Sequence, residues 1–155
     1  MTPREFPALL QAFFTDRLTR QRQASPHTIV AYRNTFRLLL RFAAVRLGRA
    51  PTHLVLADLD ADFLGEFLDH LEQERGNSAR TRNARLAAMH SFFRYVALSE
   101  PAYALQCQRV LAIPNKRFER GIVEFLSDEE IAALLDAPDT ETWIGRRDRT
   151  MLLVA

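Results

Sequence analysis

Apolar residues recur every three or four positions along most of the chain, which is the spacing of an amphipathic helix. The first such stretch covers residues 5–18, where the apolar positions are Phe6, Leu9, Leu10, Phe13, Phe14 and Leu18. The polar stretch "QRQASPHT" then interrupts the pattern. Ser25 followed by Pro26 is a strong helix start, because a serine side chain caps free backbone amides and proline suits the first turn. The pattern therefore predicts a first helix over residues 5–18 and a second helix that begins at Pro26.

The second helix is expected to continue to about Leu47, because Gly48 and Pro51 are typical residues at a helix end. One face carries arginines at four-residue spacing, namely Arg33, Arg37 and Arg41. The opposite, inner face is predicted to comprise Ile29, Tyr32, Phe36, Leu39, Leu40 and Ala43. A long helix with one apolar and one basic face is the result.

Three further helices are predicted before residue 115. The stretch "HLVLADLDADFLGEFLDHLEQERG" indicates a short extended piece and then a third helix to about Arg75, closed by Gly76. Asn77 or Ser78 caps a fourth helix, and a short fifth helix follows Pro101. The inward residues of the fourth helix are Leu86, Met89, Phe93 and Val96. The fold class predicted from these patterns is mainly α.

A domain boundary is predicted near residue 115, where the basic, proline-containing stretch "IPNKRFERG" begins. The following "GIVEFLS" fits either a short strand or an extended arm. Ser127 and Glu130 form a capping box ahead of another helix, and a last helix starts near 142–147. Its apolar end, residues 151–154, has too little neighbouring chain to cover it. We therefore expect residues 5–112 to form a protected bundle and residues 116–155 to be loosely ordered.

Length and composition limit the class of protein. A chain of 155 residues with 48% apolar and 26% charged residues is sufficient for one ordinary globular domain, or a small domain plus part of another. No apolar run approaches a membrane span, and the N-terminus lacks the pattern of a secretion signal. The single cysteine, Cys107, excludes a disulfide within the chain and a multi-cysteine zinc site. These features predict a cytoplasmic protein.

The net charge of +2 conceals a segregated distribution. Residues 1–115 contain 15 arginines and 10 acidic residues, a net charge of +5, whereas residues 116–155 contain 6 basic and 9 acidic residues, a net charge of −3. Basic residues dominate the predicted second and fourth helices, and acidic residues dominate the third. This segregation is typical of a surface that binds a polyanion, although solvated helix faces would give the same pattern.

Groupings that would indicate catalysis are scarce. The four histidines lack metal-ligand spacing, and five glycines form no phosphate-binding loop. Asp58, Asp60 and Asp62 lack the glycine and terminal glutamate of a calcium loop, so they are better explained as favouring the N-terminus of the third helix. No metal, cofactor or catalytic residue is predicted.

Three segments resemble the tyrosine recombinases of the phage-integrase family. "SPHTIVAYRNTFRLLLRFA" is similar to the second helix of that family's core-binding domain, and "ARTRNARLAAMHSFFRYV" is similar to its fourth helix. "FLSDEEIAALLDAPDTETWIGRRDRTMLLVA" resembles the opening of the catalytic domain. The resemblance implies a SAM-like core-binding bundle of four to five helices over residues 1–115. It also implies that residues 116–155 comprise a linker and the truncated start of a mixed α/β catalytic domain.

The resemblance also implies a function in DNA integration and recombination. In the family, the catalytic Arg, Lys, His and nucleophilic Tyr follow the apolar helix that "TMLLVA" begins, so this chain is expected neither to cleave nor to ligate DNA. Gly145, Arg146 and Arg147 mimic the Gly-x-Arg catalytic turn but precede that helix. The implied partner is double-stranded DNA in a bacterial or phage nucleoid, bound in the full-length family by a homotetramer on paired sites.

Candidate DNA-binding residues follow from the second and fourth helices, which lie against DNA in the family, and from the linker that follows the DNA backbone. His90 occupies a position where many relatives have arginine. The implied contacts are Thr28, Arg33, Arg37, Arg80, Thr81, Arg82, Arg85, His90, Lys116 and Arg117. Two alternatives remain open at this point: a stand-alone DNA-binding regulator of recombination sites, and a helical protein-interaction domain.

Overall fold

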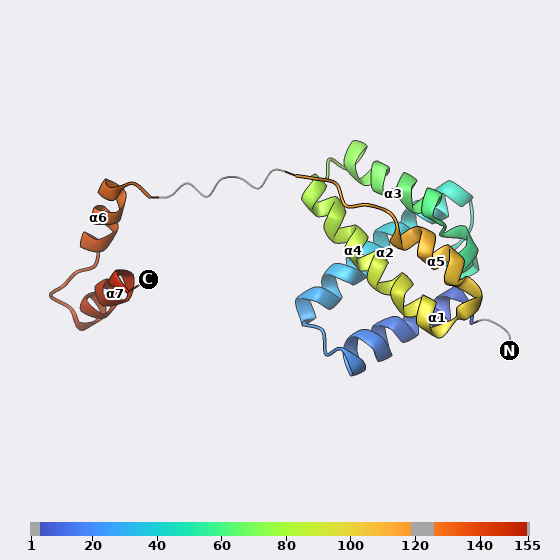
Figure 1. Ribbon diagram of the computed structural model, residues 1–155. Helices are drawn as coiled ribbons and strands as arrows, with labels where there is room; N and C mark the ends of the chain where they lie inside the picture. The colour runs from blue at the N-terminus through green and yellow to red at the C-terminus, as the bar shows by residue number, and fades with distance from the viewer. Residues whose placement is uncertain (1–3, 119–125, 155) are drawn as a thin grey trace. The chain divides into compact units, whose positions relative to one another are not determined.

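A computed structural model describes residues 4–118 and 126–154, and the chain divides into two compact units, residues 1–118 and 119–155 (Figure 1). Helices dominate both units, and the described residues contain no strand. The prediction of a mainly helical chain is therefore confirmed, whereas the mixed α/β character expected after residue 115 is not shown. Most of "GIVEFLS", predicted as a strand or an arm, lies outside the described residues.

The first helix changes its hydrogen-bonding pattern along its length. It is an α-helix, α1, over Phe6–Ala12 and a π-helix over Phe13–Gln21. Its fully buried residues Phe6, Leu9, Phe13 and Leu18 are separated by three, four and five positions. The last interval suits a π-helix, because residues five apart lie above one another there. The sequence pattern correctly predicted a helix with this stripe but missed the π-helical segment.

Helix α2 has the predicted bounds, Pro26–Leu47. The Ser25 hydroxyl accepts a hydrogen bond from the Thr28 amide, and Gly48 ends the helix with φ +62°, a left-handed conformation that glycine adopts without strain. Phe36, Leu39 and Ala43 are buried as predicted, and Ile29, Tyr32 and Leu40 are half-buried. The prediction omitted Thr35, which is only 2% exposed.

Residues 51–58 form two 3₁₀ turns, Pro51–His53 and Leu56–Asp58, and the predicted extended piece is limited to Leu54 and Val55 between them. The turns are stabilised by Asp58, whose carboxylate accepts the Val55 amide at 2.9 Å and pairs with Arg49 at 2.7 Å. This segment places Leu54, Leu56 and Leu59 in the core.

The remaining helices of the first unit are α3 (Ala61–Gln73), α4 (Ala79–Ser99) and α5 (Ala104–Leu111), the last preceded by a 3₁₀ turn at Pro101–Tyr103. Asp60 caps α3, and Ser78 rather than Asn77 caps α4. Figure 1 shows α4 running through the centre of this unit with α2, α3 and α5 around it. The residues of α4 that were predicted to point inward are all fully buried.

An aromatic cluster fills the core between α1, α2 and α4. Phe13 has its ring centroid 5.4 Å from that of Phe92 and 6.2 Å from that of Phe36, and Phe92 also contacts Phe93 at 5.4 Å. Such edge-to-face pairs add to the free energy gained by burying the rings. The cluster fixes how α2 and α4 lie against each other, and therefore the surface that they share.

The second unit contains α6 (Asp128–Asp136) and α7 (Trp143–Leu153). The predicted capping box at Ser127 and Glu130 is present. Several apolar side chains of this unit stay exposed, including Trp143 at 68%, Met151 at 61% and Leu153 at 62%. Gly145, in contrast, is buried, and a Cβ atom at this position would collide with the Asp139 carbonyl group.

Candidate nucleic-acid interface

The N-termini of α2 and α4 have the same cap. In each, a serine hydroxyl accepts the amide of a threonine three residues later at 3.2 Å, Ser25 from Thr28 and Ser78 from Thr81. The two hydroxyl groups of each pair also lie 3.0 Å and 3.1 Å apart. The caps place Thr28 and Thr81, both predicted site residues, in the first turn of the two helices.

Thr35 and Arg85 connect α2 with α4. Arg85 donates from Nη1 to the Thr35 hydroxyl at 3.1 Å, and this hydroxyl donates to the Ala31 carbonyl at 3.0 Å. Thr28 lies two turns before Thr35 on α2, and Thr81 lies one turn before Arg85 on α4, so each pair shares a helix face. We call Thr28, Thr35, Thr81 and Arg85 the junction surface.

The positive charge of Arg85 is poorly compensated. Its Nε atom is buried without a hydrogen-bond partner in the described part of the chain. Burial lowers the pKa of Arg85, and the positive charge of nearby Arg75 lowers it further. An anion placed beside these two guanidinium groups would relieve their repulsion.

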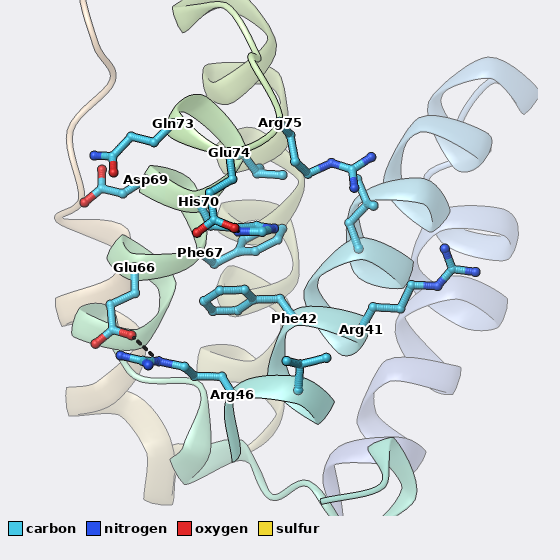
Figure 2. A pocket seen from close by; sticks show the side chains of 13 residues that line it. Arg41, Phe42, Arg46, Glu66, Phe67, Asp69, His70, Gln73, Glu74 and Arg75 are labelled. Atoms are coloured by element: carbon cyan, nitrogen blue, oxygen red, sulfur yellow. Dashed lines mark hydrogen bonds and ion pairs between the residues drawn. The ribbon is translucent and has the colours of Figure 1, made fainter. Parts of the chain in front are cut away.

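Arg41 and Arg75 extend this positive region. Both line a pocket of about 590 Å³ between α2 and α3, together with Phe42 and Phe67. Figure 2 shows the two guanidinium groups on one side of the pocket and the acidic residues Glu66 and Asp69 on the other. No ion pair of Arg41, Arg75 or Arg85 occurs among residues 4–118 and 126–154.

Arg33 and Arg37, also predicted site residues, lie on a different part of α2. Successive residues of an α-helix are about 100° apart, so both lie about 160° around the helix from Thr35. Their side chains are exposed and have no ion pair within the described residues. They form an outer flank of α2, which Arg41 continues one turn after Arg37, and do not belong to the junction surface.

Arg82, His90 and Lys116 make internal contacts. Arg82 is 6% exposed and donates to the Pro114 carbonyl at 3.2 Å, and the Lys116 ammonium group lies 2.6 Å from the Glu72 carboxylate. The His90 ring forms a hydrogen bond with the Val110 carbonyl at 3.1 Å. Burial lowers the pKa of His90, while the Val110 carbonyl raises it and Arg94 lowers it slightly. These three side chains are engaged within the fold, whereas Arg80 and Arg117 are exposed.

Sequence reasoning missed Arg41 and Arg75 as site residues, and it missed Thr35. Arg41 had been noticed only as part of the basic face of α2, and Arg75 stands at the end of the acidic third helix. The usable signal was the position of Arg75 immediately before Gly76, whose φ of +64° turns the chain back towards α4. A helix-ending arginine at such a turn lies close to the start of the next helix.

Other classes of site find little support in the part of the chain that the structure describes. No group of three or more His, Cys, Asp or Glu side chains is placed to hold a metal ion there. None of the helices in residues 4–118 and 126–154 is long and apolar enough to cross a membrane.

Comparison with known proteins decides the family. The model of the phage integrase N-terminal SAM-like domain matches residues 12–99, which include α2, α3 and α4. The chain belongs to this family. The predicted resemblance to phage integrases is thereby confirmed. No solved structure matches the chain.

Several curated relatives carry recombinase names. The chain is 56% identical over 147 residues to "Putative integrase/recombinase y4rC" and 50% identical over 145 residues to "Putative integrase/recombinase y4rD", both of Sinorhizobium fredii. These matches cover 95% and 94% of this chain but 44% and 52% of the relatives. Tyrosine recombinase XerC of Pelotomaculum thermopropionicum is 31% identical over 132 residues, which cover 85% of this chain and 42% of the relative. The chain thus spans about half the length of the curated relatives it matches.

Proposed function

We propose that residues 1–115 are the core-binding domain of a site-specific tyrosine recombinase and bind double-stranded DNA. The observation that carries the proposal is a group of three arginines without ion pairs in the described residues: Arg85 of the junction surface, Arg75, whose charge acts on Arg85, and Arg41, which shares a pocket with Arg75. This group lies within the residues that match the phage-integrase family. Relatives of this chain are named integrases and recombinases, and such enzymes act on DNA.

The physical reason is electrostatic. Uncompensated guanidinium groups that lie close together repel each other, and this repulsion lowers the stability of the fold unless an anion binds. Arginine forms forked hydrogen bonds with phosphate oxygens, so a DNA backbone is a suitable anion. Thr28 and Thr81 add hydroxyl groups at two helix N-termini, where backbone amides also favour phosphate. We propose that Arg80, Arg117, Arg33 and Arg37 contact the backbone at the edges of this surface.

The roles proposed for Arg82, His90 and Lys116 differ from direct contact. Arg82 and His90 hold the fold around α4, because their polar atoms already bind backbone carbonyls. Lys116 can reach a phosphate only by leaving Glu72. The predicted DNA-binding set thus separates into exposed contacts and supporting residues.

For residues 116–155 we propose a linker and the beginning of a mixed α/β catalytic domain. Two observations favour this over a complete catalytic unit. The relatives extend over about twice the matched length, and α6 and α7 leave large apolar side chains exposed. Arg146 donates to the Thr140 and Glu141 carbonyls and Arg147 pairs with Asp148, so both side chains already have partners within this unit. We further propose that strand cleavage and joining, by a homotetramer on paired sites, requires residues beyond these 155.

Fluorescence anisotropy with a labelled duplex of about 30 base pairs tests DNA binding. About five to seven phosphate contacts predict a log–log salt slope of about −4 to −6 and an affinity near the non-specific, micromolar range. A salt titration from 50 to 200 mM measures both quantities. Absence of binding at 50 mM salt, or binding that does not respond to salt, would exclude this proposal and favour a protein-interaction domain.

A further inference from the structure

The segment that follows α5 is tied to α4 by an asparagine side chain. Asn83 Nδ2 donates to the Lys116 carbonyl at 2.7 Å, and its Oδ1 accepts the Lys116 amide at 3.0 Å. One side-chain amide therefore satisfies both backbone groups of one residue, as a neighbouring strand would. Figure 1 shows the segment after α5 running back beside α3 and α4. We call residues 114–116 the exit segment.

A carboxylate completes the attachment. Glu72 Oε2 lies 2.6 Å from Lys116 Nζ and 3.5 Å from Arg82 Nε, so one acidic group of α3 serves both cations. Arg82 in turn donates to the Pro114 carbonyl at 3.2 Å. The Glu72 side chain is 19% exposed and the Arg82 side chain 7%, so the contact between them is shielded from solvent, whereas the Lys116 side chain is 50% exposed. Contacts with α3 and α4 thus hold the exit segment at Pro114 and at Lys116.

Two exposed arginines, Arg80 and Arg117, lie close in sequence to the residues that form these contacts. Arg80 lies three residues before Asn83, so the two side chains share a face of the helix. Arg117 directly follows the residue that Asn83 holds, and it is exposed. The chain therefore reaches Arg117 directly from Lys116, whose backbone is bound by Asn83 on the face of α4 that carries Arg80.

We propose that Asn83 and Glu72 form a latch that positions Arg117 beside Arg80, so that both bind the phosphate backbone of one DNA duplex. The latch also determines where the chain leaves the helical unit. The part of the proposal that concerns DNA rests on the proposed function, whereas the latch itself does not. The two parts are therefore tested separately.

The latch is tested by proteolysis without DNA. Lys116 is the single lysine of the sequence, so a lysine-specific endoprotease has one site, the bond between Lys116 and Arg117. Such a protease must bind the lysine side chain and its backbone carbonyl, and these are the groups that Glu72 and Asn83 hold. Asn83→Ala should raise the rate of cleavage in the folded chain at least about fivefold, because two hydrogen bonds no longer oppose opening.

Matched variants separate local release from general destabilisation. Asn34→Ala makes the same change within α2, and its side chain has no hydrogen bond among the described residues, so its cleavage rate should equal that of the wild type. Alanine favours helix more than asparagine does, so Asn83→Ala should keep its melting temperature within a few degrees. Should Asn83→Ala fail to fold, Glu72→Gln provides a second test: it weakens the contacts with Lys116 and Arg82 and should raise cleavage about twofold. An unchanged cleavage rate in folded Asn83→Ala overturns the latch. If Asn83→Ala does not fold, an unchanged cleavage rate in Glu72→Gln overturns it.

Presentation of Arg117 is tested by a double-mutant cycle in DNA binding. Arg117→Ala should weaken binding about eightfold at 0.1 M salt, the effect of one phosphate contact. If the latch presents Arg117, Asn83→Ala should weaken binding by a similar factor. The affinity of the double variant should then lie within about twofold of the affinity of Arg117→Ala. The proposal that the latch presents Arg117 is overturned if the loss of affinity in the double variant equals the product of the two single losses. It is also overturned if Asn83→Ala and Arg117→Ala both bind DNA with wild-type affinity. If the wild-type chain binds no DNA, the proposed function is overturned. The rate of cleavage at Lys116 then still shows whether the latch exists.

Discussion

Replacing Arg41 and Arg75 together by alanine should weaken DNA binding without lowering stability. Neither side chain has an ion pair among the described residues, so folding loses no charge pairing. Arg75 also repels Arg85, whose pKa it lowers, so its removal should leave the urea midpoint unchanged or slightly higher. A loss of affinity with no loss of stability distinguishes a binding role from a structural one.

The magnitude follows from counterion release. Two lost phosphate contacts should flatten the log–log salt slope by about 1.8 and reduce affinity about 60-fold at 0.1 M salt, but only about ninefold at 0.3 M salt. Anisotropy titrations at four or five salt concentrations measure both quantities on the same duplex. The salt dependence of the loss is the critical observation, because damage to the fold would weaken binding equally at every salt concentration.

A matched pair on another helix controls for the change in net charge. Arg17→Ala with Arg20→Ala also removes two positive charges, but Arg17 contacts Gln21 at 3.1 Å and Arg20 pairs with Asp16 at 3.2 Å. This pair should change affinity much less. Equal losses in both double variants would refute the reasoning. A larger loss from Arg33→Ala with Arg37→Ala would mean that the outer flank of α2, and not the junction surface, faces DNA.

Three further predictions concern the fold. Phe92→Ala should lower the free energy of unfolding by about 3–5 kcal/mol in urea denaturation followed by circular dichroism, whereas Leu105→Ala, at a position that is 65% exposed, should change it by less than about 1 kcal/mol. Burial lowers the pKa of His90, so the unfolded chain takes up the proton first as pH falls through about 6.5, and the free energy of unfolding should decrease there. His90→Gln should lose less stability than the wild type between pH 7.5 and 5. Identical pH profiles of stability for the two proteins would contradict this. Gly145→Ala should speed hydrogen exchange in α6 and α7, because the new Cβ collides with the Asp139 carbonyl, and in the wild type residues 128–154 should already exchange faster than α3 and α4.

Local sequence patterns were sufficient for most of the secondary structure. The bounds of α2 were predictable because a Ser-Pro start and a Gly end specify backbone conformation within a few residues. The capping box of α6 was predictable for the same reason. The failures arose where tertiary packing overrides local preference. The 3₁₀ turn Leu56–Asp58 buries Leu56, and the π-helical segment places Leu18 in the core.

The amino-acid sequence by itself determined the family, the helical class and the concentration of arginine on two helices. It could not determine which arginines share a surface, because that depends on how helices distant in the sequence pack together. Arg85 lies against Thr35 although fifty positions separate them, and Asn83 binds Lys116 across thirty-three. Packing of Phe36 of α2 against Phe92 of α4, whose ring centroids lie 5.3 Å apart, holds these two helices together. That packing brings Arg75 close to Arg85, turns Arg82 inward and leaves Arg33 and Arg37 on an outer flank.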